Sequence, residues 1–136
     1  MKRLLSINYS AVAFNFSMLL LRLVFGIMVL VNHGYMKMTN FVSLEPKFYD
    51  FLGMGTKATL LLSIFAEVFC ALFIVLGLFT RFAAIPLVIT MLVAVFGANA
   101  SKPLIESELA LLYLAAFTTV LFCGPGRISI DGMINK

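Results

Sequence analysis

The sequence predicts an all-α integral membrane protein, a four-helix bundle with a long first loop. Of the 136 residues, 62% are hydrophobic and only 12% are charged, about half of the charged fraction of a typical soluble domain. Four apolar segments approach the length of about 20 residues that a helix needs to cross a ~30 Å hydrocarbon core. The chain is short enough for a single domain, residues 1–136.

The first predicted helix covers residues 14–34 and contains the charged residue Arg22 in its middle. Lys2 and Arg3 precede it and could be taken for the start of a signal peptide. A signal peptide has a short, uninterrupted apolar run, however, whereas this stretch is interrupted by Arg22 and continues to Val31, so we interpret it as a retained spanning helix. Residues 33–57 then form the only long connection, in which a proline and mixed charges leave room for a short surface helix.

The second predicted helix, residues 58–78, contains Glu67 near its centre. Only three residues separate it from the third helix, residues 82–98, so these two helices are expected to be antiparallel neighbours. A proline-containing turn leads to the fourth helix, residues 107–123, which ends at the Gly-Pro-Gly sequence beginning with Gly124. The third and fourth segments are short, and the bilayer can accommodate them by local thinning or by snorkelling flanking residues.

Arg22 and Glu67 are predicted to pair inside the bundle, because charges at mid-membrane face the interior and usually pair. If Phe14 and Leu78 lie at the same membrane edge, Arg22 lies about 12 Å and Glu67 about 16 Å from it, at ~1.5 Å per residue. Such a pair could lock the bundle, or it could form a polar centre that binds or protonates a ligand. The sequence leaves both interpretations open.

His33 is the only histidine, and it follows the first apolar segment close to Lys37. We expect it to lie near Glu106 or Glu108 at the start of the fourth helix. There it would cap a helix, bond a carboxylate or carry a proton, since its pKa is ordinarily close to neutrality. The sequence contains no set of spaced metal ligands, no catalytic triad and no phosphate loop, so it predicts no metal site and identifies no catalytic residue.

Charge distribution gives a weak preference for cytoplasmic termini. Four spans place both termini on one side, and that side has five Lys or Arg residues against four on the other. The net charge of +4 comes without runs of Lys or Arg, so nucleic acid is not a predicted partner. The terminal-side residues are Lys2, Arg3, Arg81, Arg127 and Lys136, and those on the other side are Lys37, Lys47, Lys57 and Lys102.

Short motifs with polar residues and glycines follow one another along most of the chain. They are Leu21-Arg22-Leu23 with Gly26, His33-Gly34 with Lys37, Ala66-Glu67, Gly77-Leu78-Phe79-Thr80-Arg81 with Pro86, and Gly124-Pro125-Gly126-Arg127 with Ser129 and Asp131. In this order they resemble the DoxX family of small four-helix prokaryotic membrane proteins.

The resemblance implies a multi-pass protein of the bacterial inner membrane, with the lipid bilayer and a protein of a membrane redox complex as partners. Relatives include a subunit of a thiosulfate:quinone oxidoreductase. A homo-oligomer is left open. By this similarity the candidates for ligand binding or a polar centre are Arg22, His33, Lys37, Glu67, Arg81 and Glu108, and Arg127 and Asp131 also match polar positions of the family.

Two functions fit these observations. The first is a quinone-linked oxidoreductase subunit, in which His33 or Lys37 bonds a quinone oxygen and a partner carries the electrons, because the sequence has no haem, flavin or iron–sulfur motif. The alternative is a non-enzymatic scaffold or assembly factor with a purely structural ion pair. A transporter would need a water-lined path for which four short helices leave little room. We favour the first; the cofactor stays unknown, with a quinone as the candidate, and the sequence does not decide whether the chain is an enzyme.

Overall fold

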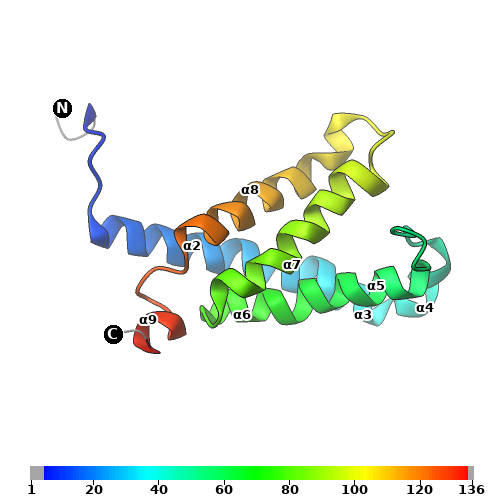
Figure 1. The fold of residues 1–136 in the computed structure, drawn as a ribbon, viewed down its shortest axis with the longest axis horizontal. Helices are drawn as coiled ribbons and strands as arrows, with labels where there is room; N and C mark the ends of the chain where they lie inside the picture. Colours follow the sequence, from blue (N-terminus) through cyan, green and yellow to red (C-terminus); the bar gives the residue numbers. More distant parts are fainter. Residues whose placement is uncertain (1–4, 135–136) are drawn as a thin grey trace.

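The computed structural model describes residues 5–134, and in that range it contains helices and no strands (Figure 1). Four helices are long and apolar enough to cross a membrane: Ala11–Thr39, Thr56–Leu76, Thr80–Ala98 and Leu104–Cys123. The predicted all-α membrane architecture is confirmed. Lys2, Arg3 and Lys136, which entered the charge count above, lie outside the described residues.

Each long helix is made of shorter helical segments. The first contains α2 (Ala11–Val29), the π-helical η1 (Leu30–Tyr35) and α3 (Met36–Thr39), and the second contains α5 (Thr56–Ile64), the π-helical η3 (Phe65–Cys70) and α6 (Ala71–Leu76). The third consists of α7 (Thr80–Val93) and the π-helical η4 (Ala94–Ala98), and the fourth of the 3₁₀ helix η5 (Leu104–Ser107) and α8 (Glu108–Cys123). π-Helical turns are rare and occur frequently at functional sites.

The first helix is longer than predicted at both ends. It begins at Ala11, because the hydroxyl of Ser10 accepts a hydrogen bond from the backbone N–H of Ala13 at 3.0 Å and caps the helix. It continues through His33 to Thr39, into the stretch predicted as a loop. The short helices α4 (Phe41–Leu44) and η2 (Glu45–Lys47) follow directly, so the irregular part of this connection is confined to residues 48–55.

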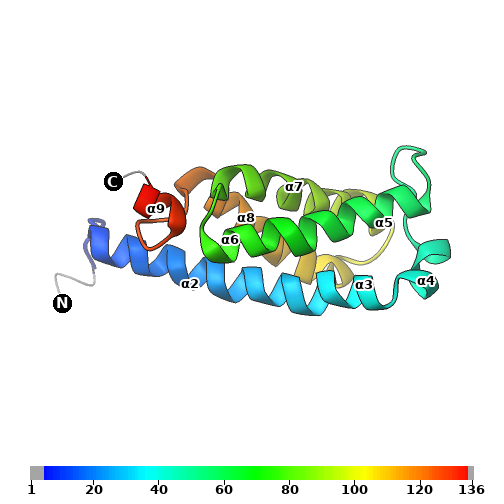
Figure 2. The same ribbon diagram turned by 90° about the horizontal axis from the view of Figure 1, so that it is seen from below.

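The four helices pack as two neighbouring pairs. α2 lies along α6, η1 lies against η3, and α7 packs along α8 (Figures 1 and 2). The fully buried core includes Val29, Ile74, Leu87 and Phe117. Many large apolar side chains point outward instead, which suits a protein whose surroundings are lipid.

The level of each charge along the bundle differs from the prediction. A Cβ atom on Gly77, in the turn after α6, would lie 3.2 Å from the guanidinium carbon of Arg22, so Arg22 is level with that turn. A Cβ on Gly34 would lie 2.7 Å from the backbone oxygen of Glu67, so Glu67 is level with Gly34. The ten residues from Glu67 to Gly77 span ~15 Å of helix. α2 therefore extends past the turn (Figure 1), and the assumption of a shared membrane edge is wrong.

The C-terminal helix α9 (Ile130–Ile134) caps α7 from outside. Asp131 accepts hydrogen bonds at 2.9 Å from the backbone N–H groups of Phe79 and Thr80 and from the Thr80 hydroxyl. A carboxylate at this position also complements the positive end of the helix dipole. Desolvation by burial raises the pKa of Asp131, but the bonds from Thr80 and Phe79 and the charge of Arg22 together lower this pKa below its ordinary value of 3.8.

Replacing Asp131 by asparagine is expected to destabilise the protein by about 1 kcal/mol at neutral pH, because the two carboxylate oxygens accept three hydrogen bonds and an amide offers only one acceptor oxygen. Because the folded-state pKa is lowered, the carboxylate stabilises the fold fully above its ordinary, unfolded-state pKa and stops doing so as the pH falls through the folded-state pKa. Thermal unfolding in detergent at several pH values should show the two proteins converging in acid. A difference that is independent of pH would contradict this role.

Candidate polar centre between the first and second spanning helices

A buried carboxylate, Glu67, is the centre of a polar cluster between the first two spanning helices. The ammonium group of Lys37 donates a hydrogen bond to Glu67 Oε1 at 2.6 Å, and the hydroxyl of Ser63 donates to the same oxygen at 3.0 Å. Lys37 also donates to Ser63 Oγ at 2.8 Å. The Glu67 side chain is 3% exposed and that of Lys37 20%. We call His33, Lys37, Ser63, Glu67 and Tyr113 the polar centre.

The two π-helical turns bring this cluster together. His33 lies in η1 and Glu67 in η3, and these segments pack against each other. Gly34 allows the close approach, because a Cβ there would lie 2.7 Å from the backbone oxygen of Glu67 and 2.7 Å from a methyl of Val68. Small residues at the contact between membrane helices commonly serve this purpose.

Gly34→Ala is therefore expected to push the first and second helices apart and to destabilise the protein by ~1–3 kcal/mol, as overpacking does. Gly26→Ala in the same helix is the control, since its Cβ would meet the Val75 side chain at 2.7 Å but no backbone atom closer than 3.5 Å. We expect that control to stay within about 1 kcal/mol of the wild type because alanine also favours helix. SDS titration of the folded fraction measures both, and equal losses would contradict the close-contact argument.

Two aromatic rings form the part of the polar centre that faces α8. The rings of His33 and Tyr113 meet edge-to-face, with centroids 5.4 Å apart and an interplanar angle of 86°. Tyr113 is 2% exposed, and both side chains lie within electrostatic reach of the Glu67 carboxylate. Among the described contacts, the neighbour of His33 is thus Tyr113, and not Glu106 or Glu108 as predicted.

One oxygen of the polar centre has no donor. Glu67 Oε2 is buried and accepts no hydrogen bond from the described residues. Leaving such a group unsatisfied costs roughly 1–3 kcal/mol, and more when it is charged, so each one in a native structure requires an explanation such as a bound molecule or a catalytic role. A ligand with a hydroxyl or amine donor would supply the missing bond. Residues 5–134 contain no cluster of three or more His, Cys, Asp or Glu side chains that could hold a metal ion.

Arg22 is bonded by the protein itself, at the end of the bundle that carries the tail. Its side chain is buried, with 2% of the residue exposed. The guanidinium donates to four backbone oxygens: Nε to Ile74 at 3.1 Å, Nη1 to Pro125 at 2.7 Å and to Ile128 at 2.8 Å, and Nη2 to Val75 at 3.3 Å. The predicted pair with Glu67 is thus wrong, and Arg22 anchors the tail to α2 and α6.

Two further predicted candidates lie on the outside of the bundle. Arg81 is exposed and donates one hydrogen bond, at 3.2 Å, to the backbone oxygen of Phe122. Glu108 is exposed at the start of α8 and lines a hollow there. The structure therefore brings three of the six candidates together, His33, Lys37 and Glu67, and places Arg22, Arg81 and Glu108 elsewhere.

Sequence reasoning missed two aromatic members of this region. Tyr113 lies against His33 from the fourth helix, within electrostatic reach of Glu67, and its one signal was a tyrosine in the middle of a largely apolar segment. The ring of Phe48, from the irregular part of the first connection, has its centroid 5.3 Å from the ammonium nitrogen of Lys37, a cation–π contact. Nothing distinguished Phe48 among the fourteen phenylalanines of the sequence.

Comparison with known families covers the polar centre except Tyr113. The DoxX family model matches residues 17–100, which are 84 of the 136 residues and include His33, Lys37 and Glu67. Glu108 and the tail lie outside the matched range. No curated protein and no solved structure matches the chain. The match extends over more than half of the sequence, and it agrees with a structure of four candidate membrane spans: this chain belongs to the DoxX family of membrane proteins.

Proposed function

We propose that this DoxX-family protein is the membrane subunit of a redox complex and binds the head group of a quinol or quinone at its polar centre. The observation that carries the proposal is Glu67 Oε2, a buried carboxylate oxygen without a donor. A quinol presents a hydroxyl group that can donate to this oxygen, and hydrogen bonds to an ionised acceptor are the stronger ones.

The surroundings of Glu67 suit such a ring. Binding sites for small molecules are mostly apolar with a few precisely placed polar groups. Here Lys37 and His33 can donate to the second oxygen of the head group, and the aromatic ring of Tyr113 borders the same place. The outer surface of the four helices is apolar, so the isoprenoid tail of the quinol would lie along it in the bilayer.

The chain would contribute binding and proton exchange, and a partner would contribute electron transfer. Oxidation of a quinol to a quinone breaks two O–H bonds and releases two protons and two electrons, and reduction reverses this. Glu67 Oε2 would exchange one of the two protons, and the other would go to or come from water. Both electrons would pass to or from a partner protein that holds a flavin, a haem or an iron–sulfur cluster.

A binding titration tests the proposal. A short-tailed quinol, kept anaerobic, is titrated into detergent-solubilised wild type, Glu67→Gln and the matched control Glu106→Gln. We expect Glu67→Gln to bind the quinol about tenfold more weakly, which corresponds to ~1.4 kcal/mol and to one charge-assisted hydrogen bond. Glu106→Gln should bind like the wild type. Equal binding by all three proteins would overturn the proposal and favour the scaffold alternative, with Lys37–Glu67 as a structural lock.

We further propose a location in the bacterial inner membrane with cytoplasmic termini, supported by the family and by the small excess of basic residues on the terminal side. Cys123 is free and exposed at the end of α8 on that side. A membrane-impermeant maleimide added to intact spheroplasts should leave Cys123 unmodified until the membrane is opened. Labelling of Cys123 in closed spheroplasts would show that the termini lie on the opposite side of the membrane.

A further inference from the structure

The two carboxylate oxygens of Glu67 differ in what a ligand at the polar centre would find. Oε1 accepts two hydrogen bonds, at 2.6 Å from Lys37 and at 3.0 Å from Ser63, whereas Oε2 accepts none from the described residues. The side chain is only 3% exposed, so water has little access to the free oxygen. A ligand that enters the polar centre therefore meets a bare acceptor and has to bring the donor itself.

The neighbours of Ser63 fix the direction of its hydrogen bonds. An ammonium group has three hydrogens and no acceptor, so Ser63 Oγ is the acceptor in its 2.8 Å contact with Lys37 Nζ. The single hydrogen of the Ser63 hydroxyl then goes to Glu67 Oε1. Lys37 and Ser63 thus both donate to one oxygen of Glu67, which stabilises the ionised carboxylate, and neither is bonded to Oε2.

We propose that the polar centre selects the reduced form of its ligand, a quinol, over the corresponding quinone, and that Lys37 and Ser63 determine this selectivity by holding Glu67 Oε1. The inference rests on the proposed function. A quinol hydroxyl donates to Oε2, whereas a quinone has two carbonyl oxygens and no donor, so it leaves Oε2 buried and unsatisfied. The second oxygen of the head group can accept from His33 or Lys37 in either form and does not distinguish them.

The selectivity should also change the redox chemistry of the bound molecule. Sites built to hydrogen-bond a hydroxyl reject analogues that lack it, because the buried partner is then left unpaired. We expect the quinol to bind about ten- to a hundredfold more tightly than the quinone, the range that one unsatisfied buried acceptor costs. Tighter binding of the reduced form raises the midpoint potential of the bound couple. Since tenfold corresponds to ~30 mV for a two-electron couple, the expected rise is ~30–60 mV.

Binding titrations with both redox forms test the selectivity. One short-tailed head group is titrated into the solubilised wild type as the quinol, under anaerobic conditions, and separately as the quinone, and its midpoint potential is measured with and without the protein. Equal affinity for the two forms, with no shift of the potential, would overturn the inference. The proposed function would still stand in that case if Glu67→Gln weakens quinol binding. Binding of neither form would overturn both.

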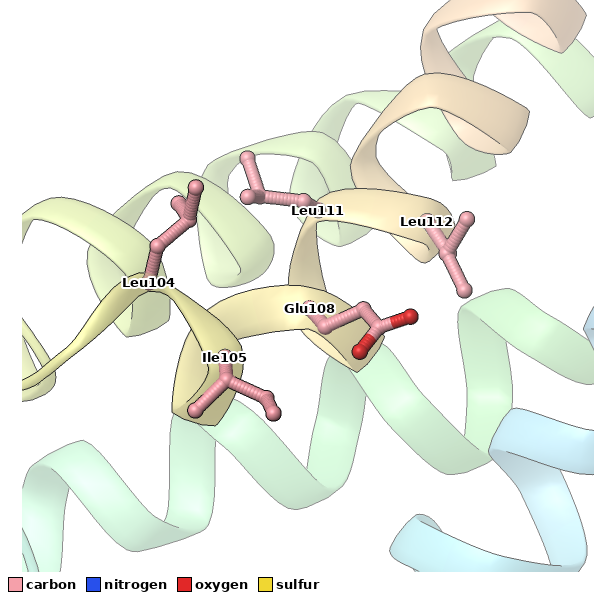
Figure 3. A pocket seen from close by; sticks show the side chains of 5 residues that line it. All are labelled: Leu104, Ile105, Glu108, Leu111 and Leu112. Carbon is pink, nitrogen blue, oxygen red and sulfur yellow. The ribbon is translucent and has the colours of Figure 1, made fainter.

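An isosteric substitution assigns the preference to Glu67. Glu67→Gln should abolish or reverse it, because an amide has the same shape as a carboxylate but can present N–H donors to a quinone carbonyl. Glu108→Gln is the matched control, since the Glu108 carboxylate is exposed and lies among aliphatic side chains in an open hollow outside the polar centre (Figure 3). This control should keep the preference of the wild type. A preference that survives Glu67→Gln would contradict the assignment to Oε2.

Two variants of Ser63 test its positioning role. Without the hydroxyl, Lys37 loses one of its two acceptors and can turn to Glu67 Oε2 itself, so Ser63→Ala should lower the preference for quinol severalfold. Ser63→Thr keeps a hydroxyl and should restore the preference. A loss of folded protein lowers the binding of both forms equally, so the ratio of the two affinities separates positioning from stability. An unchanged ratio in Ser63→Ala would show that Ser63 does not determine selectivity.

Discussion

Replacing Arg22 by methionine is expected to destabilise the protein by at least about 3 kcal/mol and to release its C-terminal tail. The guanidinium is buried and donates to four backbone oxygens, two at the end of α6 and two in the segment that leads to α9. Methionine can fill much of the space but donates nothing, and each buried acceptor left unsatisfied costs ~1–3 kcal/mol. SDS titration measures the stability, and limited proteolysis followed by mass spectrometry reports release of the tail.

Arg81→Met is the matched control for this prediction. It removes the same charge from an exposed position whose guanidinium makes one hydrogen bond, to Phe122. We expect a loss below ~1 kcal/mol, the usual range for an exposed polar contact, and a tail that resists protease as in the wild type. If the Arg22 and Arg81 variants lose equal stability, or if the tail of the Arg22 variant stays protected, the anchoring role of Arg22 is wrong.

Replacing Lys37 by methionine should destabilise the protein by about 3 kcal/mol. Removing one partner of a buried ion pair leaves an uncompensated charge and typically costs 3–5 kcal/mol, and the partial exposure of Lys37 places it at the low end. Lys57→Met, an exposed lysine at the start of α5 for which the described residues provide no ion pair, is the control and should change stability little. Both are measured by SDS titration.

A double variant shows whether the loss comes from the charge of Glu67. Combining Lys37→Met with Glu67→Gln removes both charges of the pair, so the double variant should recover most of the stability that Lys37→Met loses. Coupling between contacting residues of this kind is typically 0.5–3 kcal/mol. If the two single losses simply add, Lys37 stabilises the protein through some contact other than Glu67, such as that with Phe48.

The helices of this protein could be predicted from sequence because the apolar segments are long and the turns between them are marked by glycine and proline. The position of one helix along the bundle axis relative to the next could not be predicted from sequence. Apolar composition does not show that α2 extends past the turn at Gly77, because the exposed side chains of its first half are as apolar as a membrane span. The continuation of the first helix to Thr39 was also not predicted, because the polar residues His33 and Lys37 follow the apolar segment and were assigned to the loop. Only the structure shows that Glu67 provides Lys37 with a partner inside the bundle.

The error in pairing Arg22 with Glu67 has a second cause in helix geometry. Side chains of an α-helix lean toward its N-terminus. In antiparallel helices they therefore lean in opposite directions: Arg22 toward the tail, and Glu67 toward the connection after the first helix. Lys37 lies closer to that connection than Glu67 does. Its side chain leans toward the N-terminus of the first helix and therefore points back toward Glu67. The sequence thus supplied Glu67 and, among its candidates, the neighbours His33 and Lys37. That Lys37 and not Arg22 pairs with Glu67, and that Tyr113 lies beside them, depended on the level of each helix.

Infrared difference spectroscopy tests most directly whether Glu67 is the partner of a bound quinol. The spectrum of the protein with a short-tailed quinol minus that of the protein alone is recorded for wild type, Glu67→Gln and Glu106→Gln. If the quinol donates a hydrogen bond or a proton to Glu67 Oε2, the difference spectra of the wild type and of Glu106→Gln contain a carboxyl or carboxylate band. The difference spectrum of Glu67→Gln lacks that band. The same bands in all three proteins would show that the quinol binds elsewhere and that the buried carboxylate only holds the helices together.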